Sequence, residues 1–237
     1  MRIFELKKKK TCALLAAMLS VVVVAFALTS PMIVYATRMA SKKPTIVIDA
    51  GHGGADAGVT GKTTGLRESD LNLQIAMILG EMLKGAGYFV VYTRTNDTML
   101  DIVKADTKKR SDMFSRAKII NNVGADIVVS IHANYFPSEA RRGAQVFFER
   151  KSEGAFQLAT CVQNSLNVIN EEKTDRLYSP LTADKYLLTC SPAVSIIVEC
   201  GFLSNPADEI LLQTPEYRAQ IAEAIVQGLC KYFEIAL

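Results

Sequence analysis

The chain has 237 residues, of which 49% are hydrophobic and 22% are charged, a composition typical of a globular protein. This length suffices for one α/β domain with a buried core, since single α/β domains commonly reach about 200–250 residues. The formal net charge is +3, but residues 1–40 hold six of the 27 basic and one of the 24 acidic residues, which leaves 21 basic and 23 acidic residues in the remainder. A remainder without clustered positive charge argues against nucleic-acid binding.

Residues 1–36 are interpreted as a signal peptide or a membrane anchor. A basic stretch from Lys7 to Lys10 precedes an apolar run from Cys12 to Leu28, which only Ser20 interrupts. The run is longer than the about 7–15 apolar residues of a signal peptide and reaches the about 17–25 of a spanning helix, so cleavage and anchoring both stay open. The lysines are expected to stay inside, so the rest of the chain faces outward.

A polar linker over residues 37–44 is followed by one folded domain, residues 45–237. Its first half is predicted to alternate between strand and helix, with strands over 45–49, 88–93 and 125–131, and with helices from Ser69 to Gly85 and through 114–123. We expect Ser69 to cap the first of these helices. The charged run around Lys108 is expected to be a solvated loop.

The second half continues the pattern with strands over 144–149 and 193–198, separated by a helix over 153–169 and a polar segment to Lys185. Thr214 is expected to cap the last helix, with Pro215 in its first turn. The alternation predicts an α/β fold with a single mixed, mainly parallel sheet sandwiched between helices.

Four cysteines lie beyond the leader, and each is inside an apolar segment without a CxxC pair: Cys161, Cys190, Cys200 and Cys230. Their even number would permit two disulfides in an oxidising compartment. Their apolar surroundings favour buried free thiols.

Only two histidines occur in the chain, and each follows directly on an apolar strand: His52 and His132. Ligands of open α/β sheets bind beyond the carboxyl ends of the strands, so we expect both imidazoles to converge there. Glu68, just before the expected helix cap, and Glu199, at the end of an apolar strand, occupy comparable places. Taken singly, each glutamate is explained as a solvated or paired carboxylate.

A catalytic zinc site needs three protein ligands of the His/His/Glu type, an open position for water and a further carboxylate that transfers protons. The two histidines and two glutamates supply this set, although the residues alone do not decide which glutamate binds the metal. Asp49 and Asn134 are candidates for orienting the ligands. A dinucleotide site is disfavoured, because GHGGADAG lacks the GxGxxG order. Cys200 is expected to point away from Glu199 into the core.

Four blocks, IVIDAGHGG, GLRESDLNL, RAKIINNVGADIVVSIHAN and IIVECGFLSN, together resemble the zinc-dependent N-acetylmuramoyl-L-alanine amidases of the amidase-3 type. The resemblance runs in order from about Thr45 to the C-terminus. It implies that His52, Glu68 and His132 bind Zn²⁺ and that Glu199 is the catalytic carboxylate.

Two positions depart from the family's common residues: Ala50 replaces a proline and Ser69 replaces a lysine. Neither change removes a ligand. Only 66 residues separate His132 from Glu199, which leaves no room for the helical insertion that covers the zinc in some larger members.

The resemblance implies cleavage of the amide between the lactyl group of N-acetylmuramic acid and L-alanine in peptidoglycan. The compact chain with its segment KTDRLYSPLTADKYLLTCSPAV is most similar to the germination-specific amidases of spore-forming bacteria, which implies action in the spore cortex before muramic lactam formation. A zinc peptidase acting on stem peptides and a non-catalytic peptidoglycan-binding homologue are the alternatives. We expect an extracytoplasmic protein that depends on its leader at the membrane, or on an escort or activating protein, to reach the wall or cortex.

Overall fold

The computed structural model describes residues 43–236. The expected leader, residues 1–36, and nearly all of the expected linker lie outside the described residues. Within residues 43–236 no helix combines the length and the apolar character needed to cross a membrane.

The described chain alternates between strands and helices as predicted. The first half contains β1 (Thr45–Ala50), α2 (Glu68–Gly85), β2 (Phe89–Tyr92), α3 (Lys108–Asn122) and β3 (Ile127–Asn134). The second half contains β4 (Gln145–Phe148), α4 (Glu153–Thr174), β5 (Leu181–Thr182), the 3-10 turn η1 (Tyr186–Leu188), β6 (Val194–Phe202), α5 (Pro206–Gln213) and α6 (Pro215–Ala236).

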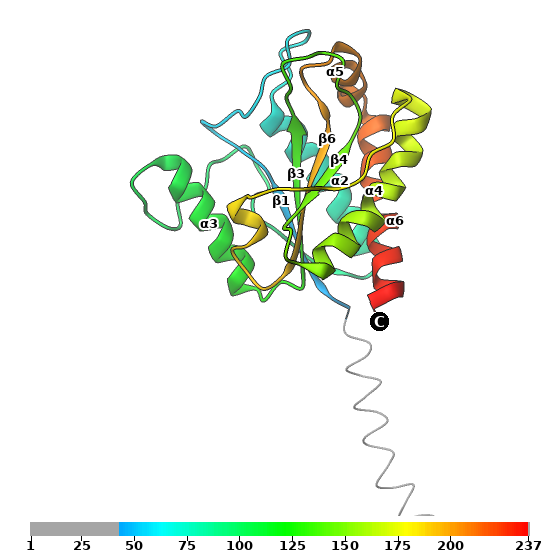
Figure 1. Cartoon of the computed structure of the whole chain (residues 1–237). Coiled ribbons are helices and arrows are strands. Elements are labelled where there is room, and N and C mark those ends of the chain that lie inside the picture. Colours follow the sequence, from blue (N-terminus) through cyan, green and yellow to red (C-terminus); the bar gives the residue numbers. More distant parts are fainter. Residues whose placement is uncertain (1–42, 237) are drawn as a thin grey trace, which may run out of the picture. The chain divides into compact units, whose positions relative to one another are not determined.

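The strands form one six-stranded sheet in the order β2-β1-β3-β6-β4-β5 (Figure 1). β2, β1, β3 and β6 run parallel, whereas β4 pairs antiparallel with β6 and parallel with β5. Every residue of β1 is buried, as expected for an apolar strand covered on both faces. The predicted mixed, mainly parallel sheet is confirmed.

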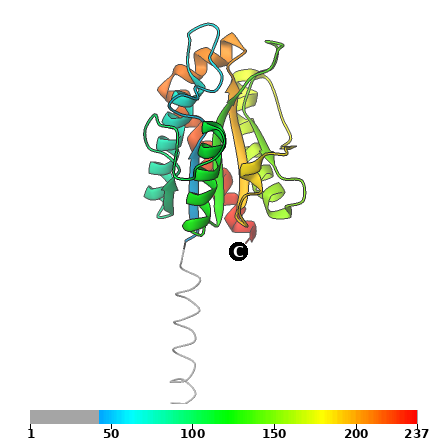
Figure 2. The ribbon, with the colours of Figure 1, turned by 90° about the vertical axis from the view of Figure 1, so that its left-hand side faces the viewer.

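Helices cover both faces of the sheet. Apolar side chains of α2, α4 and α6 form the larger core with one face, including Ile75, Leu158 and Ile225. A smaller cluster on the other face packs Ile120 of α3 and Leu187 of η1 against Val47 and Val128. Figure 2 shows α3 in front of the strands. The prediction of a sheet between helices is therefore also correct.

Several predicted boundaries are wrong for identifiable reasons. α2 begins at Glu68 with Arg67 in the cap position and no side-chain cap, so Ser69 is inside the helix rather than its cap. Lys108 opens α3 instead of lying in a loop, because Thr107 caps that helix by accepting a hydrogen bond from the Arg110 N–H.

Thr214 does accept a hydrogen bond from the Tyr217 N–H at 3.3 Å, as its predicted capping role requires.

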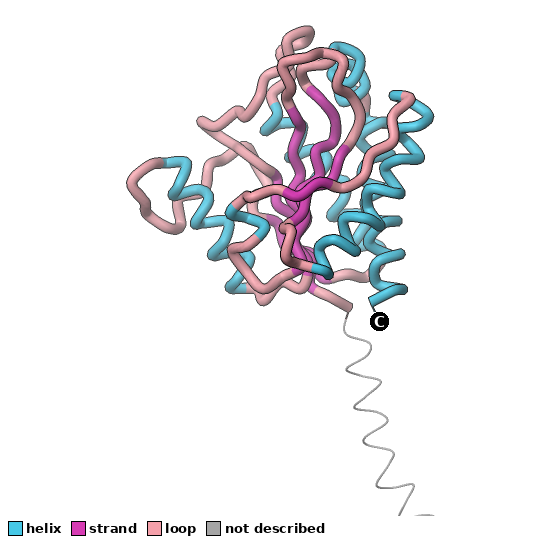
Figure 3. Tube along the Cα trace, in the orientation of Figure 1, coloured by secondary structure: helices cyan, strands magenta, loops and turns pink. Residues whose placement is uncertain are grey.

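The carboxyl ends of β1, β3 and β6 position the site. β3 and β6 extend beyond their predicted ends, so His132 and Glu199 are inside neighbouring strands and stand opposite each other in the register. The ladder shifts between His132 and Asn134. The loops that follow β1 and β3 lie at the upper end of the sheet in the view of Figure 1, where Figure 3 draws loop segments in pink.

Candidate metal centre

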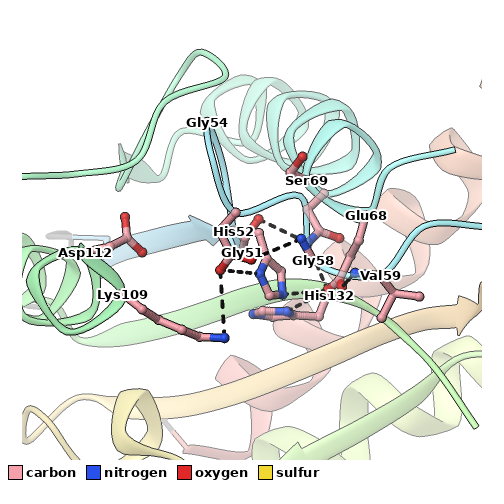
Figure 4. A network of polar contacts seen from close by, with 12 residues as sticks. Gly51, His52, Gly54, Gly58, Val59, Glu68, Ser69, Lys109, Asp112 and His132 are labelled. Atoms are coloured by element: carbon pink, nitrogen blue, oxygen red, sulfur yellow. Dashed lines mark hydrogen bonds and ion pairs between the residues drawn. The ribbon is translucent and has the colours of Figure 1, made fainter. Parts of the chain in front are cut away.

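Three segments of the chain bring His52, Glu68 and His132 together (Figure 4). His52 is in the turn after β1, Glu68 is the first residue of α2, and His132 is in β3. One ligand atom from each side chain lies within 4.8 Å of the other two. Two imidazoles and one carboxylate at this spacing can hold a metal ion.

Glu68 is at the centre of this group. Its Oε1 lies 3.1 Å from Nε2 of His52 and 3.0 Å from Nδ1 of His132, while its Oε2 accepts the Val59 N–H at 2.8 Å. Burial alone would raise the pKa of Glu68, but the hydrogen bonds from the two histidines outweigh burial and lower this pKa well below its usual range. The carboxylate is therefore ionised, as a metal ligand must be.

The chain keeps side chains away from this carboxylate. Gly58 adopts φ +64°, and a β-carbon at this position would overlap the carboxyl group of Glu68. Only glycine combines this backbone conformation with such a close approach.

Asp56 is a member of the site that the sequence interpretation missed. Its Oδ2 lies 2.9 Å from Nδ1 of His52, on the side of the ring opposite Nε2, which faces Glu68. A carboxylate on the far nitrogen fixes the tautomer and the orientation of a ligating imidazole. The available signal was an aspartate four residues after His52, in a stretch that otherwise reads as a glycine-rich turn.

Glu199 lines the same pocket as the three candidate ligands, a cavity of about 520 Å³. Its Oε2 is buried and has no hydrogen-bond partner among the described residues. Burial raises the pKa of Glu199, and the nearby His132 offsets this rise only in part. A buried carboxyl oxygen without a protein partner is rare and calls for a functional explanation.

Asp49 and Asn134 both line the pocket, but neither hydrogen-bonds to a histidine. Asp49 instead accepts hydrogen bonds from Ser130, Thr93 and Arg116. Burial would raise the pKa of Asp49, but Arg116 and the two hydroxyl groups outweigh burial and lower it to about 2. Asn134 accepts the N–H of the following residue, Tyr135. Any orienting effect of Asp49 on the ligands must therefore be indirect.

The four cysteines of the described chain are free thiols. Cys200, which adjoins Glu199, is fully buried in the larger core. Burial raises the pKa of its thiol well above the usual range, so Cys200 is unsuited to act as a nucleophile.

The site therefore combines a His/Glu/His group that could hold a metal ion with a buried carboxyl, at the carboxyl ends of strands in a mainly parallel α/β sheet. The family model described as N-acetylmuramoyl-L-alanine amidase matches residues 46–231. The chain belongs to this family of peptidoglycan-hydrolysing enzymes.

Known relatives agree with this assignment. The chain is 35% identical over 193 residues to the germination-specific N-acetylmuramoyl-L-alanine amidase of Bacillus subtilis, which covers 79% of each chain. The solved CwlD amidase of Clostridioides difficile, in complex with the GerS lipoprotein, is 34% identical with a TM-score of 0.74 and covers 81% of this chain and 100% of its own. The amidase AmiC2 of Nostoc punctiforme is 31% identical with a TM-score of 0.68, over 81% of this chain and 97% of its own.

Proposed function

We propose that the chain is a zinc-dependent N-acetylmuramoyl-L-alanine amidase in which His52, Glu68 and His132 hold Zn²⁺ and Glu199 transfers protons. One observation carries the proposal: Oε2 of Glu199, which has no hydrogen-bond partner within residues 43–236, is buried in the pocket that the three donor side chains line. A proton-transfer group needs a lone pair that no protein donor occupies.

The donor set fits zinc. Two imidazole nitrogens and one carboxylate are the ligands of many catalytic zinc sites, whereas Ca²⁺ and Mg²⁺ prefer sites built from oxygen. Three protein donors leave a coordination position for water or substrate. When bound, the ion would lower the pKa of water towards about 7 and polarise the substrate carbonyl.

Glu199 is proposed to act twice. It accepts a proton from the water that attacks the carbonyl carbon of the lactyl group, and it returns that proton to the nitrogen of L-alanine as the C–N bond breaks. The products are a free carboxyl group on muramic acid and a peptide with a new amino terminus. Asp56 holds the His52 ring during this sequence through the contact to Nδ1.

We test the metal requirement by removal and replacement. Dialysis of the full chain against a zinc chelator is expected to stop the release of peptide from peptidoglycan, and one equivalent of zinc is expected to restore it. Full activity in protein shown to be metal-free would contradict the proposal.

The substrate in the cell is proposed to be spore-cortex peptidoglycan, because the similar Bacillus subtilis protein is germination-specific. Stripped muramic acid residues would then be available for lactam formation by a separate deacetylase. Spores without this gene are expected to lack muramic lactam. A normal lactam content in such spores would show that the enzyme acts on another part of the wall.

The enzyme is proposed to act outside the cytoplasm. Its leader and a protein partner are proposed to bring it to its substrate there. The CwlD structure contains the GerS lipoprotein, which supports a membrane-associated partner of this kind. Anchoring would confine the domain to a thin layer in which weak glycan affinity suffices. The full chain is expected to co-purify with such a lipoprotein from sporulating cells, and recovery of the chain alone would count against the partner.

A further inference from the structure

Two buried arginines surround the turn that carries His52. Arg94, which follows β2, and Arg116 of α3 are 3% and 2% exposed. Their guanidinium groups donate to the carbonyl oxygens of three consecutive residues, 50, 51 and 52. His52 itself adopts φ +62°, a conformation that non-glycine residues rarely take unless their surroundings impose it.

Arg116 holds the turn from the side of α3. Its Nη2 donates to the carbonyl oxygen of His52 at 2.7 Å, and its Nη1 donates to that of Ala50 at 2.7 Å. The same guanidinium is paired with Asp49 and Asp112, each at 2.7 Å. The position of His52 is therefore fixed relative to both β1 and α3.

Arg94 joins two of the ligand-bearing segments. Its Nη2 donates to the carbonyl oxygen of Gly51 at 2.9 Å and to that of Ser69 at 2.8 Å. Gly51 precedes His52, and Ser69 follows Glu68, so a single nitrogen atom links the backbones beside two candidate metal ligands. A shift of either segment would break one of these hydrogen bonds.

The two buried arginines carry positive charge into the protein interior, where two carboxylates, Asp49 and Asp112, are also buried. Arg94 has no carboxylate within ion-pair distance among the described residues, and all four of its hydrogen bonds go to backbone carbonyl oxygens. Burying a guanidinium in this way is unfavourable compared with apolar packing. The carboxylates of Asp49 and Asp112 balance the two cations, so the cluster adds no net positive charge beside the metal site.

We propose that Arg94 and Arg116 are positioning residues that clamp the turn at residues 50–52 and thereby set the affinity of the site for zinc. The proposal rests on the proposed metal site. Lysine keeps the charge but has one nitrogen and cannot reach several carbonyl oxygens in the fixed geometry of a guanidinium. Loss of such supporting contacts typically weakens metal affinity by about 10–100-fold.

The test compares Arg116→Lys and Arg94→Lys with Arg142→Lys in the full chain, using zinc alone as the probe. Arg142 is a matched control because it pairs with Asp208 and donates to the Lys173 carbonyl, and none of these residues lines the metal pocket. Competition with a chelator is expected to show zinc affinity at least about 10-fold weaker in the two clamp variants and unchanged in the control. Asp112→Asn is a milder variant that loosens Arg116 without touching the turn, and it should show a smaller loss of affinity.

A second readout needs no metal. Amide hydrogen exchange at Gly51 and Gly53, whose N–H groups donate to Ile131 and Asp56, is expected to accelerate in the metal-free clamp variants but not in the control. If folded clamp variants show unchanged zinc affinity and unchanged hydrogen exchange, the proposed role of the two arginines is wrong, while the proposed metal site still stands. A wild-type chain that binds no zinc would overturn the metal site and, with it, this role for the arginines.

Discussion

Gly51 lies directly against the imidazole of His132: a β-carbon at residue 51 would overlap the ring atoms. The backbone cannot retreat, because the Gly51 N–H donates to the carbonyl oxygen of Ile131 at 3.0 Å and Arg94 holds the Gly51 carbonyl oxygen. The absence of a side chain at residue 51 is therefore a condition for the position of a proposed zinc ligand in the neighbouring strand.

Gly51→Ala is accordingly expected to displace the His132 ring and to weaken zinc binding by at least about 10-fold, the range seen when a ligand loses its support. The measurement is zinc affinity by chelator competition. Gly85→Ala is the control, because a β-carbon there meets nothing within 4 Å. Wild-type affinity in Gly51→Ala would show that the ring position is not critical.

Glu199→Gln is expected to retain the fold and bound zinc while lowering turnover by at least about 10²-fold, since the amide keeps the shape of the side chain but cannot accept the proton. Steady-state hydrolysis of peptidoglycan and metal analysis of the same sample provide the two readouts. Glu223→Gln on the exposed side of α6 is the matched control. Near-normal turnover in Glu199→Gln would move the catalytic role to another residue.

Replacing Asp56, which supports His52, should weaken zinc binding less than replacing His52 itself. Asp56→Asn is expected to weaken zinc affinity about 10–100-fold, because the amide holds Nδ1 of His52 less strongly than the carboxylate does. His52→Ala is expected to lose stoichiometric zinc altogether, since a site with three protein ligands has no spare donor. Asp106→Asn, at an exposed pair with Arg110, controls for the loss of a surface carboxylate. If His52→Ala keeps its zinc, His52 is structural.

The sequence predicted the sheet and the convergence of His52, His132 and Glu199 at one end of it because these features leave local signals, whereas the choice of Glu68 as a ligand rests on the family resemblance and stays a prediction. Apolar runs identified the strands, and the only two histidines followed such runs, as did Glu199. Ser69 precedes an apolar periodic stretch, which is the usual signal of a cap, whereas the helix starts one residue earlier at Glu68.

Other members of the site leave a weak local signal or none. Arg94 and Arg116 contact the His52 turn across more than 40 residues of sequence, and only the packing of β2 and α3 beside β1 brings them there. Asp56 is close in sequence to His52, but a glycine-rich stretch does not show which side chains face each other. Predicting the hydrogen bonds of the two arginines and of Asp56 therefore requires the tertiary structure.

Reductant is expected to leave the thermal stability of the chain almost unchanged. The four cysteines of residues 43–236 are free thiols, and the Cys200 Sγ is fully buried near the Val198 carbonyl oxygen at 3.8 Å. A native disulfide would typically contribute about 2–4 kcal/mol to the free energy of unfolding. A large drop in melting temperature on reduction alone would contradict this prediction.

Mass spectrometry of the reaction products identifies directly which bond the enzyme cleaves. Purified peptidoglycan is incubated with the zinc-loaded full chain, with Glu199→Gln as the parallel control. We predict free peptides that begin with L-alanine, together with glycan fragments whose N-acetylmuramic acid carries no peptide, and neither product in the control. Glycan that keeps L-alanine on every muramic acid, with new ends inside the stem peptides, would contradict the account and identify a peptidase instead.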